Sequence, residues 1–523
     1  MGHPTAPTGA TPDAALTADA TLTQDDASPH DASPLDAATR RRNNTVIWVL
    51  IISAFTVILN ETIMGVAIPH LMTDLGITAV AAQWLTTAFL LTMAVVIPTT
   101  GFMLQRFTTR GLYIAAMGLF VAGTVLAAAA PGFELLLVAR VVQASGTAIM
   151  LPLLITTVME LEPAETRGRR MGMISVVISV APAIGPTISG LILTTFSWRF
   201  LFIAVLPIAG AVYWLGTLRM QTVNEPRKTP IDLLSIPLTA LGFGGLVIGL
   251  SRVGEAAENG AASAWLALGV GVVGVALFTW RQLVLQRSDR ALLDLRTFRT
   301  PAFVYSILLF VVSMMGLFGT IILLPLYMQD VLEYSVLTSG LLLLPGGLTM
   351  GLLATGVGRA FDRLGPRPLL IPGMVVVAGS LWALALAVSA TTAWWVLLAC
   401  HVTLSLGLAF VFTPLFTSSL SSLPPRLYSH GSATVSTIQQ VAAAAGTALF
   451  VSTMVAVAAR HADAGAAEAV AQSQGIKVAF LVGACLTTVG IPLSAMLRRP
   501  TTPPESGATD SVGSSSESAI ASR

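Results

Sequence analysis

Residues 46–69 read VIWVLIISAFTVILNETIMGVAIP, an almost unbroken apolar run that carries one acidic residue, Glu61. About 20 apolar residues in a helix span the roughly 30 Å hydrocarbon core of a bilayer, so the run is predicted to cross a membrane. An acidic group at that depth costs a few kcal/mol and persists where it faces a cavity or a partner. Glu61 is therefore a candidate for carrying protons, although a structural polar anchor that never titrates is the alternative.

The composition of the whole chain agrees with a membrane environment. Hydrophobic residues make up 54% of the sequence and charged residues 10%, whereas an average soluble domain has about 25% charge. The surroundings are predicted to be a lipid bilayer. The net charge of +2 argues against nucleic acid as a partner.

Further apolar runs follow along the chain, and together with the first they predict fourteen membrane spans. The predicted spans are 46–69, 83–104, 112–130, 135–158, 171–195, 200–218, 233–251, 264–284, 303–327, 337–357, 369–388, 394–415, 431–457 and 478–497.

The distribution of basic residues predicts the orientation. With both termini in the cytoplasm, nearly all arginines fall on the cytoplasmic side, as the positive-inside rule requires. The outer side keeps only Arg199, Arg252, Arg460 and Lys477. Since lysine occurs only at positions 228 and 477, the composition also indicates a GC-rich bacterium. We therefore expect a multi-pass protein of the bacterial cell membrane.

An internal repeat suggests how the spans are grouped. The segment 358–367 (GRAFDRLGPR) follows the tenth span, and the related segment 101–110 (GFMLQRFTTR) follows the second. Repeats of this kind are common in secondary transporters. The predicted organisation is a disordered tail (1–43), a six-helix half (44–220), a two-helix insertion (221–300), a second six-helix half (301–499) and a disordered tail (500–523).

A second deep charge, Arg140, lies in the fourth span. It is predicted about 8 Å below the outer surface and Glu61 about 12 Å, at 1.5 Å per helical residue. If the two helices adjoin, Arg140 would ease proton release from Glu61. A static ion pair that only holds two helices together is the alternative.

Other polar and aromatic residues in the spans are candidates for a central substrate cavity, since amide groups and aromatic faces suit bulky or cationic guests. Ordinary helix packing is an equally good reading of each. The candidates are Asn60, Trp84, Phe89, Gln143, Met314, Phe318, Gln439 and Gln440.

These motifs together resemble the major facilitator superfamily, and within it the fourteen-span drug:proton antiporters. The acidic residue with Thr62 and the 66–69 ending (VAIP) is similar to that branch's first-span signature. Arg140 with Gln143 and Gly146 is similar to the fourth-span motif. The resemblance covers about residues 44–499 and implies an all-α major facilitator fold of two six-helix halves.

The resemblance also gives a meaning to the fifth span. By physics alone, Gly185, Pro186 and Gly190 mark a site of close packing or of a helix bend. They look like the superfamily's antiporter motif, which is linked to export more than to uptake.

One departure from the family pattern lies after the second span. Gln105 and Thr108 stand where the family has an Asp and a Gly, while Arg106 and Arg110 remain. The loss of the Asp puts the first-half gate contact in doubt. The second copy is intact through Asp362, Arg363, Gly365 and Arg367, so we expect it to bear more of the gating; a solvated loop with topogenic arginines is the alternative.

The expected function is export of hydrophobic or cationic small molecules, such as drugs or antibiotics, in exchange for protons. No cofactor or metal is expected, the energy source is the proton gradient, and we expect a monomer. A transporter of one specific metabolite with the same fold is the alternative. A membrane-embedded enzyme is disfavoured, because neither lysine follows a glycine as a P-loop requires, no His-Glu-x-x-His motif exists, and only His401 falls within a predicted span.

Overall fold

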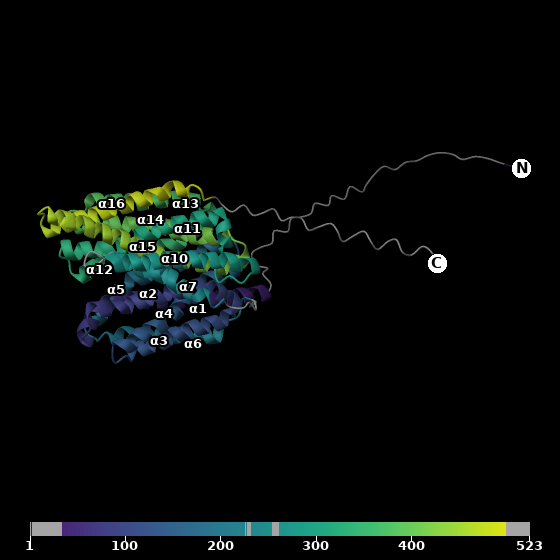
Figure 1. Ribbon diagram of the computed structural model, residues 1–523. Helices are drawn as coiled ribbons and strands as arrows, with labels where there is room; N and C mark the ends of the chain where they lie inside the picture. The colour runs from purple at the N-terminus through teal and green to yellow at the C-terminus, as the bar shows by residue number, and fades with distance from the viewer. Residues whose placement is uncertain (1, 3–33, 225, 227–231, 254–260, 498–523) are drawn as a thin grey trace. The chain divides into compact units, whose positions relative to one another are not determined.

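The computed structural model describes residues 2, 34–224, 226, 232–253 and 261–497 (Figure 1). In these ranges the secondary structure is helical, without strands. The chain divides into two units, residues 1–44 and 45–523. The predicted C-terminal tail, and the predicted N-terminal tail up to residue 33 apart from Gly2, lie outside the described residues.

Fourteen of the described helical segments are long and apolar enough to cross a membrane, which confirms the predicted number. The elements are α1 (Pro34–Leu75), α2 (Ala79–Arg106), α3 (Thr109–Ala128), α4 (Phe133–Leu161), α5 (Arg167–Leu193), α6 (Arg199–Arg219), α7 (Ser235–Thr239), η1 (Ala240–Gly244), α8 (Gly245–Val253), α10 (Ala261–Leu285), η2 (Gln286–Ser288), η3 (Leu295–Arg299), α11 (Pro301–Leu326), η4 (Tyr327–Val331), α12 (Val336–Leu364), α13 (Arg367–Ala387), α14 (Trp394–Ser421), η5 (Pro425–Leu427), α15 (Tyr428–Asp463) and α16 (Glu468–Ser494).

Helix α1 begins at Pro34, before the predicted boundary at residue 43, because proline suits a first helical turn and the following Leu, Ala and Arg residues favour helix. The boundary itself lies one residue from the division of the chain after Asn44. One detail of the sequence prediction was wrong: His430 and His461, besides His401, fall within a segment long and apolar enough to cross a membrane, since η5 and α15 continue without a break from Pro425 to Asp463.

The helices form two groups with matching internal contacts. In the first group, α1–α6, helix α4 packs on α2 and α3, and α3 packs on α6 (Figure 1). In the second group, α11–α16, helix α14 packs on α12 and α13, and α13 packs on α16. Between the groups, α5 lies along α12 and α14, and α15 lies along α2 and α4. Helix α4 therefore occupies in the first group the position that α14 occupies in the second.

The inserted helices contact both groups, because α8 packs on α2 and on α15. Their own packing depends on glycine: a methyl group at Gly242 would lie 2.8 Å from the backbone of Val275, and one at Gly271 would lie 2.4 Å from that of Leu246. At one end, Arg281 donates hydrogen bonds of 2.8 and 3.2 Å to Asp232, which hold the pKa of that carboxyl group below its usual range.

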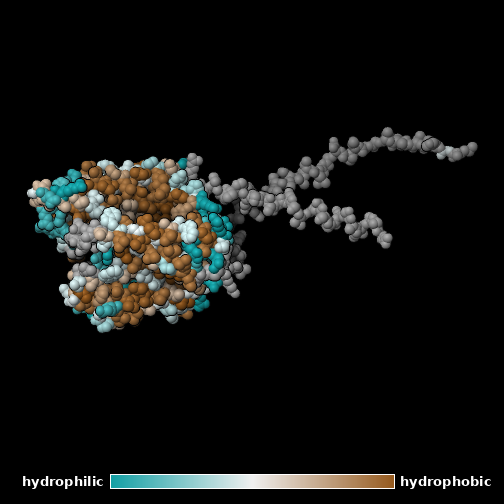
Figure 2. Space-filling model, in the orientation of Figure 1, coloured by the Kyte–Doolittle hydropathy of each residue, from teal (hydrophilic) through white to brown (hydrophobic). Residues whose placement is uncertain are grey.

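The surface over the helices is apolar, as a chain solvated by lipid requires. Figure 2 shows hydrophobic residues over the middle of the helical bundle and hydrophilic residues gathered toward its two ends. Trp214, Trp265 and Leu352 are 65%, 61% and 82% exposed. Such exposure would cost stability in water, but lipid chains are as apolar as these side chains.

Candidate functional site

The buried charge of α4 is held by a chain of polar contacts within the first group. Arg140, only 1% exposed, donates a 2.6 Å hydrogen bond to the Gln143 side chain. Gln143 in turn donates a 2.9 Å hydrogen bond to the hydroxyl of Thr124 on α3. The guanidinium group also lies 4.0 Å from the centre of the Phe89 ring on α2, a favourable cation–π contact when desolvated. Arg140 is thus fixed in one position by three helices.

Glu61 lies half-buried in the middle of α1, and its charge interacts with that of Arg140. Among the described residues no direct ion pair joins them. The Nε atom of Arg140 and the Oδ1 atom of the neighbouring Asn60 are buried without a hydrogen-bond partner in the described part of the chain. The site therefore combines opposite charges with an unused Arg140 donor, which can bind an acceptor group of a polar ligand.

The glycine-rich stretch of α5 packs directly against α1 beside Glu61. A methyl group at Gly185 would lie 2.2 Å from the hydroxyl of Thr62, so only glycine fits there. Ser189 donates a 3.0 Å hydrogen bond to the carbonyl of Ile63. Pro182 and Pro186 lie within the same helix, while Gly190 has open space beside it. A movement of α5 therefore changes the surroundings of Glu61.

We define the arginine-rich end of the bundle as the end where α2, α4, α6 and α12 finish. There Asp362 of α12 reaches across to the other group and accepts hydrogen bonds from the backbone N–H groups of Gly168 (2.7 Å) and Arg169 (2.9 Å). These are free donors of the first turn of α5, whose own N-cap residue, Thr166, makes no side-chain cap bond. Asp362 acts as a cap supplied by the opposite group, at the helix end that favours a negative charge.

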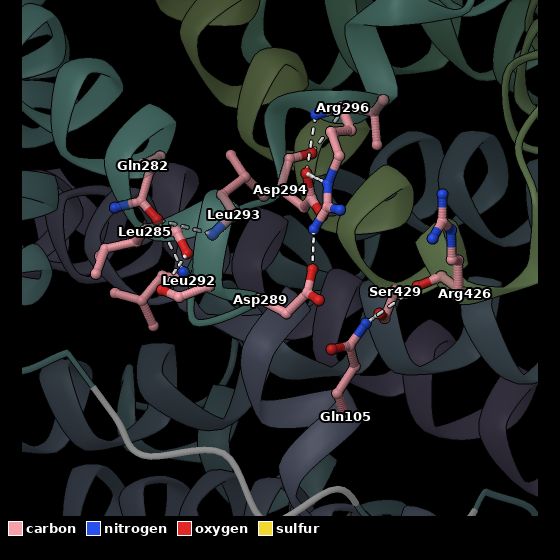
Figure 3. Close-up of polar contacts among 12 residues, drawn as sticks. Gln105, Gln282, Leu285, Asp289, Leu292, Leu293, Asp294, Arg296, Arg426 and Ser429 are labelled. Carbon is pink, nitrogen blue, oxygen red and sulfur yellow. Dashed lines mark hydrogen bonds and ion pairs between the residues drawn. The ribbon is translucent and has the colours of Figure 1, made fainter.

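Gln105 makes the corresponding contact between α2 and the start of α15 (Figure 3). Its amide donates hydrogen bonds of 3.1 Å each to the carbonyl of Arg426 and the hydroxyl of Ser429. The first-half contact is thus present without the acidic residue. It is a neutral contact, however, and neutral hydrogen bonds are about half as strong as those to a charged group.

Close packing continues from these two contacts toward the middle of the bundle. A methyl group at Gly172 would lie 2.5 Å from the Ala354 carbonyl, and one at Gly347 would lie 2.1 Å from Ala183. The two groups are therefore joined at the arginine-rich end and, along α5 and α12, as far as the contact of Ala183 with Gly347.

The remaining arginines of the two loop motifs have different surroundings. Arg110 donates a 2.9 Å hydrogen bond to the Thr217 carbonyl, and Arg367 donates one of the same length to the Leu497 carbonyl. Each contact remains within one helix group. Arg106 is half-buried and Arg363 exposed at the end of α12.

The predicted cavity residues separate into two sets. Gln143 and Phe89 contact Arg140, so the structure brings these two to the charge site, and Asn60 is buried one position before Glu61 in α1. Met314 is 1% exposed in the core and Trp84 is 38% exposed. Half-buried Gln440 donates to the sulfur of Met93 at 3.8 Å, and Phe318 and Gln439 are half-buried.

Sequence reasoning missed several hydrogen-bond partners of the predicted site residues and of the helix ends near them. Thr124 supports Gln143, and the backbone of Gly168 and Arg169 receives Asp362. Asn224, in the connector after α6, accepts from the N–H and hydroxyl of Thr109 at 2.9 and 2.7 Å. None of these lies in a motif: Thr124 is near the end of α3, and Asn224 reaches the start of α3 from 115 positions away.

The two contacts at the arginine-rich end predict unequal effects of mutation. Asp362→Ala leaves two N–H groups of α5 without acceptors, which costs about 1–3 kcal/mol, whereas Gln105→Ala removes neutral hydrogen bonds worth about 1 kcal/mol. We expect Asp362→Ala to shift the protein toward separation of the two groups there by about tenfold or more. Spin labels at Ala164→Cys and Ser422→Cys, with Cys400 and Cys485 replaced by Ala, report that separation by electron–electron resonance. Equal distance distributions in the Asp362→Ala protein and its parent would contradict this role.

A helical membrane bundle with two matching six-helix groups, a buried arginine and a half-buried glutamate within its spans defines a membrane transporter. The family model of the major facilitator superfamily matches residues 50–447. The chain belongs to the major facilitator superfamily.

Proteins of known sequence and structure agree with this assignment. The chain is 41% identical over 463 residues to the uncharacterized MFS-type transporter YcnB of Bacillus subtilis, covering 88% of this chain and 96% of that protein. It is 39% identical over 461 residues to the lincomycin resistance protein LmrB of Listeria monocytogenes, covering 87% and 96%. The structure of the human organic anion transporter MFSD10 (TETRAN) has a TM-score of 0.59 and 14% identity, covering 86% and 99%.

Proposed function

We propose that this protein exports hydrophobic or cationic small molecules from a bacterial cell in exchange for protons. The observation that carries the proposal is the interaction of Glu61 with the fixed charge of Arg140, in a part of α1 against which the glycine-rich stretch of α5 is packed. The name of the Listeria relative, a lincomycin resistance protein, supports a drug or antibiotic as the cargo.

At this site a proton, Arg140 and a cationic substrate compete for the carboxylate of Glu61. When a proton binds the carboxylate, the attraction between α1 and Arg140 weakens while Arg140 keeps its contacts with Gln143 and Phe89. When the proton leaves, the negative charge is available to Arg140 or to a cationic substrate. Such an exchange couples two ligands that favour different states.

We further propose that the arginine-rich end lies in the cytoplasm, with both termini, and that the membrane is the cell membrane. The positive-inside rule supports this orientation. With that orientation, the Asp362 and Gln105 contacts close the cytoplasmic side, and the structure corresponds to a state that faces outward. The functional division remains two halves, 44–220 and 301–499, with 221–300 as the insertion, in a monomer.

Transport of one specific compound is a second candidate, because the Listeria relative is named for a single antibiotic. A resistance panel in a host that lacks its own pumps separates the two. Protection against chemically unrelated cations and antibiotics supports a multidrug exporter. Protection confined to one class supports a specific exporter.

Everted membrane vesicles test direction and energy source together. We expect vesicles with the protein to accumulate ethidium when respiration makes their interior acidic, and to lose it when nigericin and valinomycin collapse the gradient. Vesicles without the protein are the control. Accumulation that persists or increases after collapse of the gradient would overturn proton-driven export.

A further inference from the structure

The second helix group also contains a buried ionisable side chain with unused hydrogen-bonding capacity. His401 on α14 is 7% exposed, and its Nε2 lies 3.2 Å from the carbonyl oxygen of Leu343 on α12. Because a carbonyl only accepts hydrogen bonds, Nε2 carries the hydrogen and Nδ1 holds a lone pair. That Nδ1 is buried without a partner among the described residues.

His401 occupies in the second group the position that Arg140 occupies in the first. Arg140 follows the first residue of α4, Phe133, by seven positions, and His401 follows the first residue of α14, Trp394, by the same seven. The two helices have matching neighbours, since α4 packs on α2 and α3 and α14 packs on α12 and α13.

The match extends to the contact surface under each side chain. Arg140 lies over Phe89, ten positions after the first residue of α2, Ala79. His401 lies against Gly346, ten positions after the first residue of α12, Val336, and a methyl group there would lie 2.4 Å from the imidazole ring. Both groups thus place an ionisable side chain at one depth against their second helix.

The contact with Gly346 connects His401 to the interface between the groups. The next residue along α12, Gly347, packs so closely on α5 that a methyl group would lie 2.1 Å from Ala183. Pro345, which precedes the two glycines, lies inside α12 and removes one backbone hydrogen bond. A change at His401 therefore acts on a weakened segment of α12 where it meets the glycine-rich stretch of α5.

No charged neighbour compensates a positive charge at His401 in the described structure, where its only polar interaction is with Leu343. The helices that pack on α14 carry their charged or titratable residues near their ends. These residues are Arg167, Arg169 and Arg170 on α5, Tyr305 on α11, Arg359, Asp362 and Arg363 on α12, Arg367 on α13, and Tyr428, His430, Arg460, His461 and Asp463 on α15; Cys400 adjoins His401 on α14 itself.

We propose that His401 is a second proton-binding residue, and that its protonation favours separation of the two helix groups at the arginine-rich end. In the present state its protonation would bury an unpaired charge between α12 and α14, which is unfavourable. A state that hydrates or pairs the imidazolium is favoured instead. This inference rests on the proposed proton coupling and adds a proton site in the second group to the one at Glu61.

A test of His401 requires a protein in which Glu61 can no longer bind a proton. In a Glu61→Gln background with spin labels at Ala164→Cys and Ser422→Cys, we expect the open-to-closed ratio at the arginine-rich end to rise about tenfold between pH 8.0 and 5.5. Adding His401→Gln should reduce that rise to less than about twofold. Glutamine retains a donor for the Leu343 carbonyl but cannot be protonated. The comparison therefore separates the effect of protonating His401 from the effect of changing its packing.

The matched control is His461→Gln. His461 is half-buried in the last turn of α15, and its replacement should leave the pH response unchanged. An equal pH response with and without His401 would overturn the inference, and so would the absence of any response in the Glu61→Gln protein. These outcomes are distinct from failure of the proposed function. If vesicles show no proton-driven transport while the His401-dependent response persists, proton-driven export is wrong and the titration of His401 stands.

A second measurement avoids any change at His401. Cys400-His401 is the only Cys-His pair in the sequence, so carbonyl-labelled cysteine with uniformly labelled histidine selects this residue in solid-state NMR spectra of lipid-reconstituted Glu61→Gln protein. We expect the ring shifts of a neutral Nε2–H tautomer at pH 8.0 and of an imidazolium at pH 5.5. A ring that stays neutral at both pH values would overturn the proposal.

Discussion

Glu61→Gln is expected to abolish gradient-driven accumulation of substrate while leaving the protein folded. The amide has nearly the same shape as the carboxyl group but carries no proton through the cycle. With one pH unit and 100 mV, one proton supplies about 1.4 plus 2.3 kcal/mol, enough for a concentration ratio of about 500 for a neutral substrate. The variant should fall to a ratio of about 1, because the proton exchanged for substrate is the one bound at Glu61, whereas protonation of His401 only shifts the balance between the two conformations.

Reconstituted vesicles with an imposed proton gradient measure this ratio directly. Glu134→Gln, which removes an exposed carboxylate in the first turn of α4, is the matched control and should retain wild-type accumulation. Exchange of labelled for unlabelled substrate, which needs no gradient, should persist in Glu61→Gln. If Glu61→Gln exports against a gradient at the wild-type rate, Glu61 does not carry the proton.

Arg140→Met is expected to cause the largest loss of stability among substitutions of charged residues in the first helix group. The change leaves Gln143 without its 2.6 Å donor and Glu61 without the opposing charge. Removing one partner of a directly bonded buried charge pair costs about 3–5 kcal/mol, and because Arg140 forms no direct ion pair with the half-buried Glu61, we expect a loss near the lower end, about 3 kcal/mol. By contrast Arg199, paired with Asp74 at 33% and 51% side-chain exposure, should cost about 1 kcal/mol or less when changed to Met.

A double-mutant cycle in thermal unfolding separates the charge pair from packing. Because Glu61→Gln removes the uncompensated carboxylate, Arg140→Met with Glu61→Gln should be more stable than Arg140→Met alone, by about 1–3 kcal/mol. Transport should remain absent in both. If Arg140→Met destabilises the protein no more than Arg199→Met, Arg140 is not held by a compensated buried network.

The membrane spans were predictable because they depend on local composition. The predicted span 83–104 lies within α2 (Ala79–Arg106), and the predicted span 112–130 overlaps α3 (Thr109–Ala128). Both helices start before the apolar run, because each begins at a capping threonine. Thr108, for example, accepts a hydrogen bond from Gly111 N–H and begins α3.

The functional contacts were predictable only in part. Depth along each helix predicts that Glu61 and Arg140 are neighbours, since a helix rises by a constant amount per residue; among the described residues no direct ion pair joins them. The same reasoning offered no partner for Asp362. Its carboxylate oxygens accept hydrogen bonds from the backbone N–H groups of Gly168 and Arg169, which lie nearly two hundred positions away in the sequence. Because every residue except proline has a backbone N–H group, residue types do not reveal which of these groups will serve as donors.

The role of Gln105 shows the same limit. Judged as a departure from a family pattern, it put the first-half gate contact in doubt. In the structure its amide reaches the start of α15 by two hydrogen bonds. The neutral amide makes this contact without the charge that an Asp would carry, and only the position of α15 reveals this.

The sequence by itself determined the fourteen spans and the apolar surface, because hydropathy acts residue by residue. Only the tertiary structure decided which faces meet. It placed Thr124 behind Gln143, Thr62 against Gly185 and Leu343 beside His401. Helices in lipid are sorted by close packing and hydrogen bonding rather than by hydrophobicity, since lipid and protein interior are equally apolar.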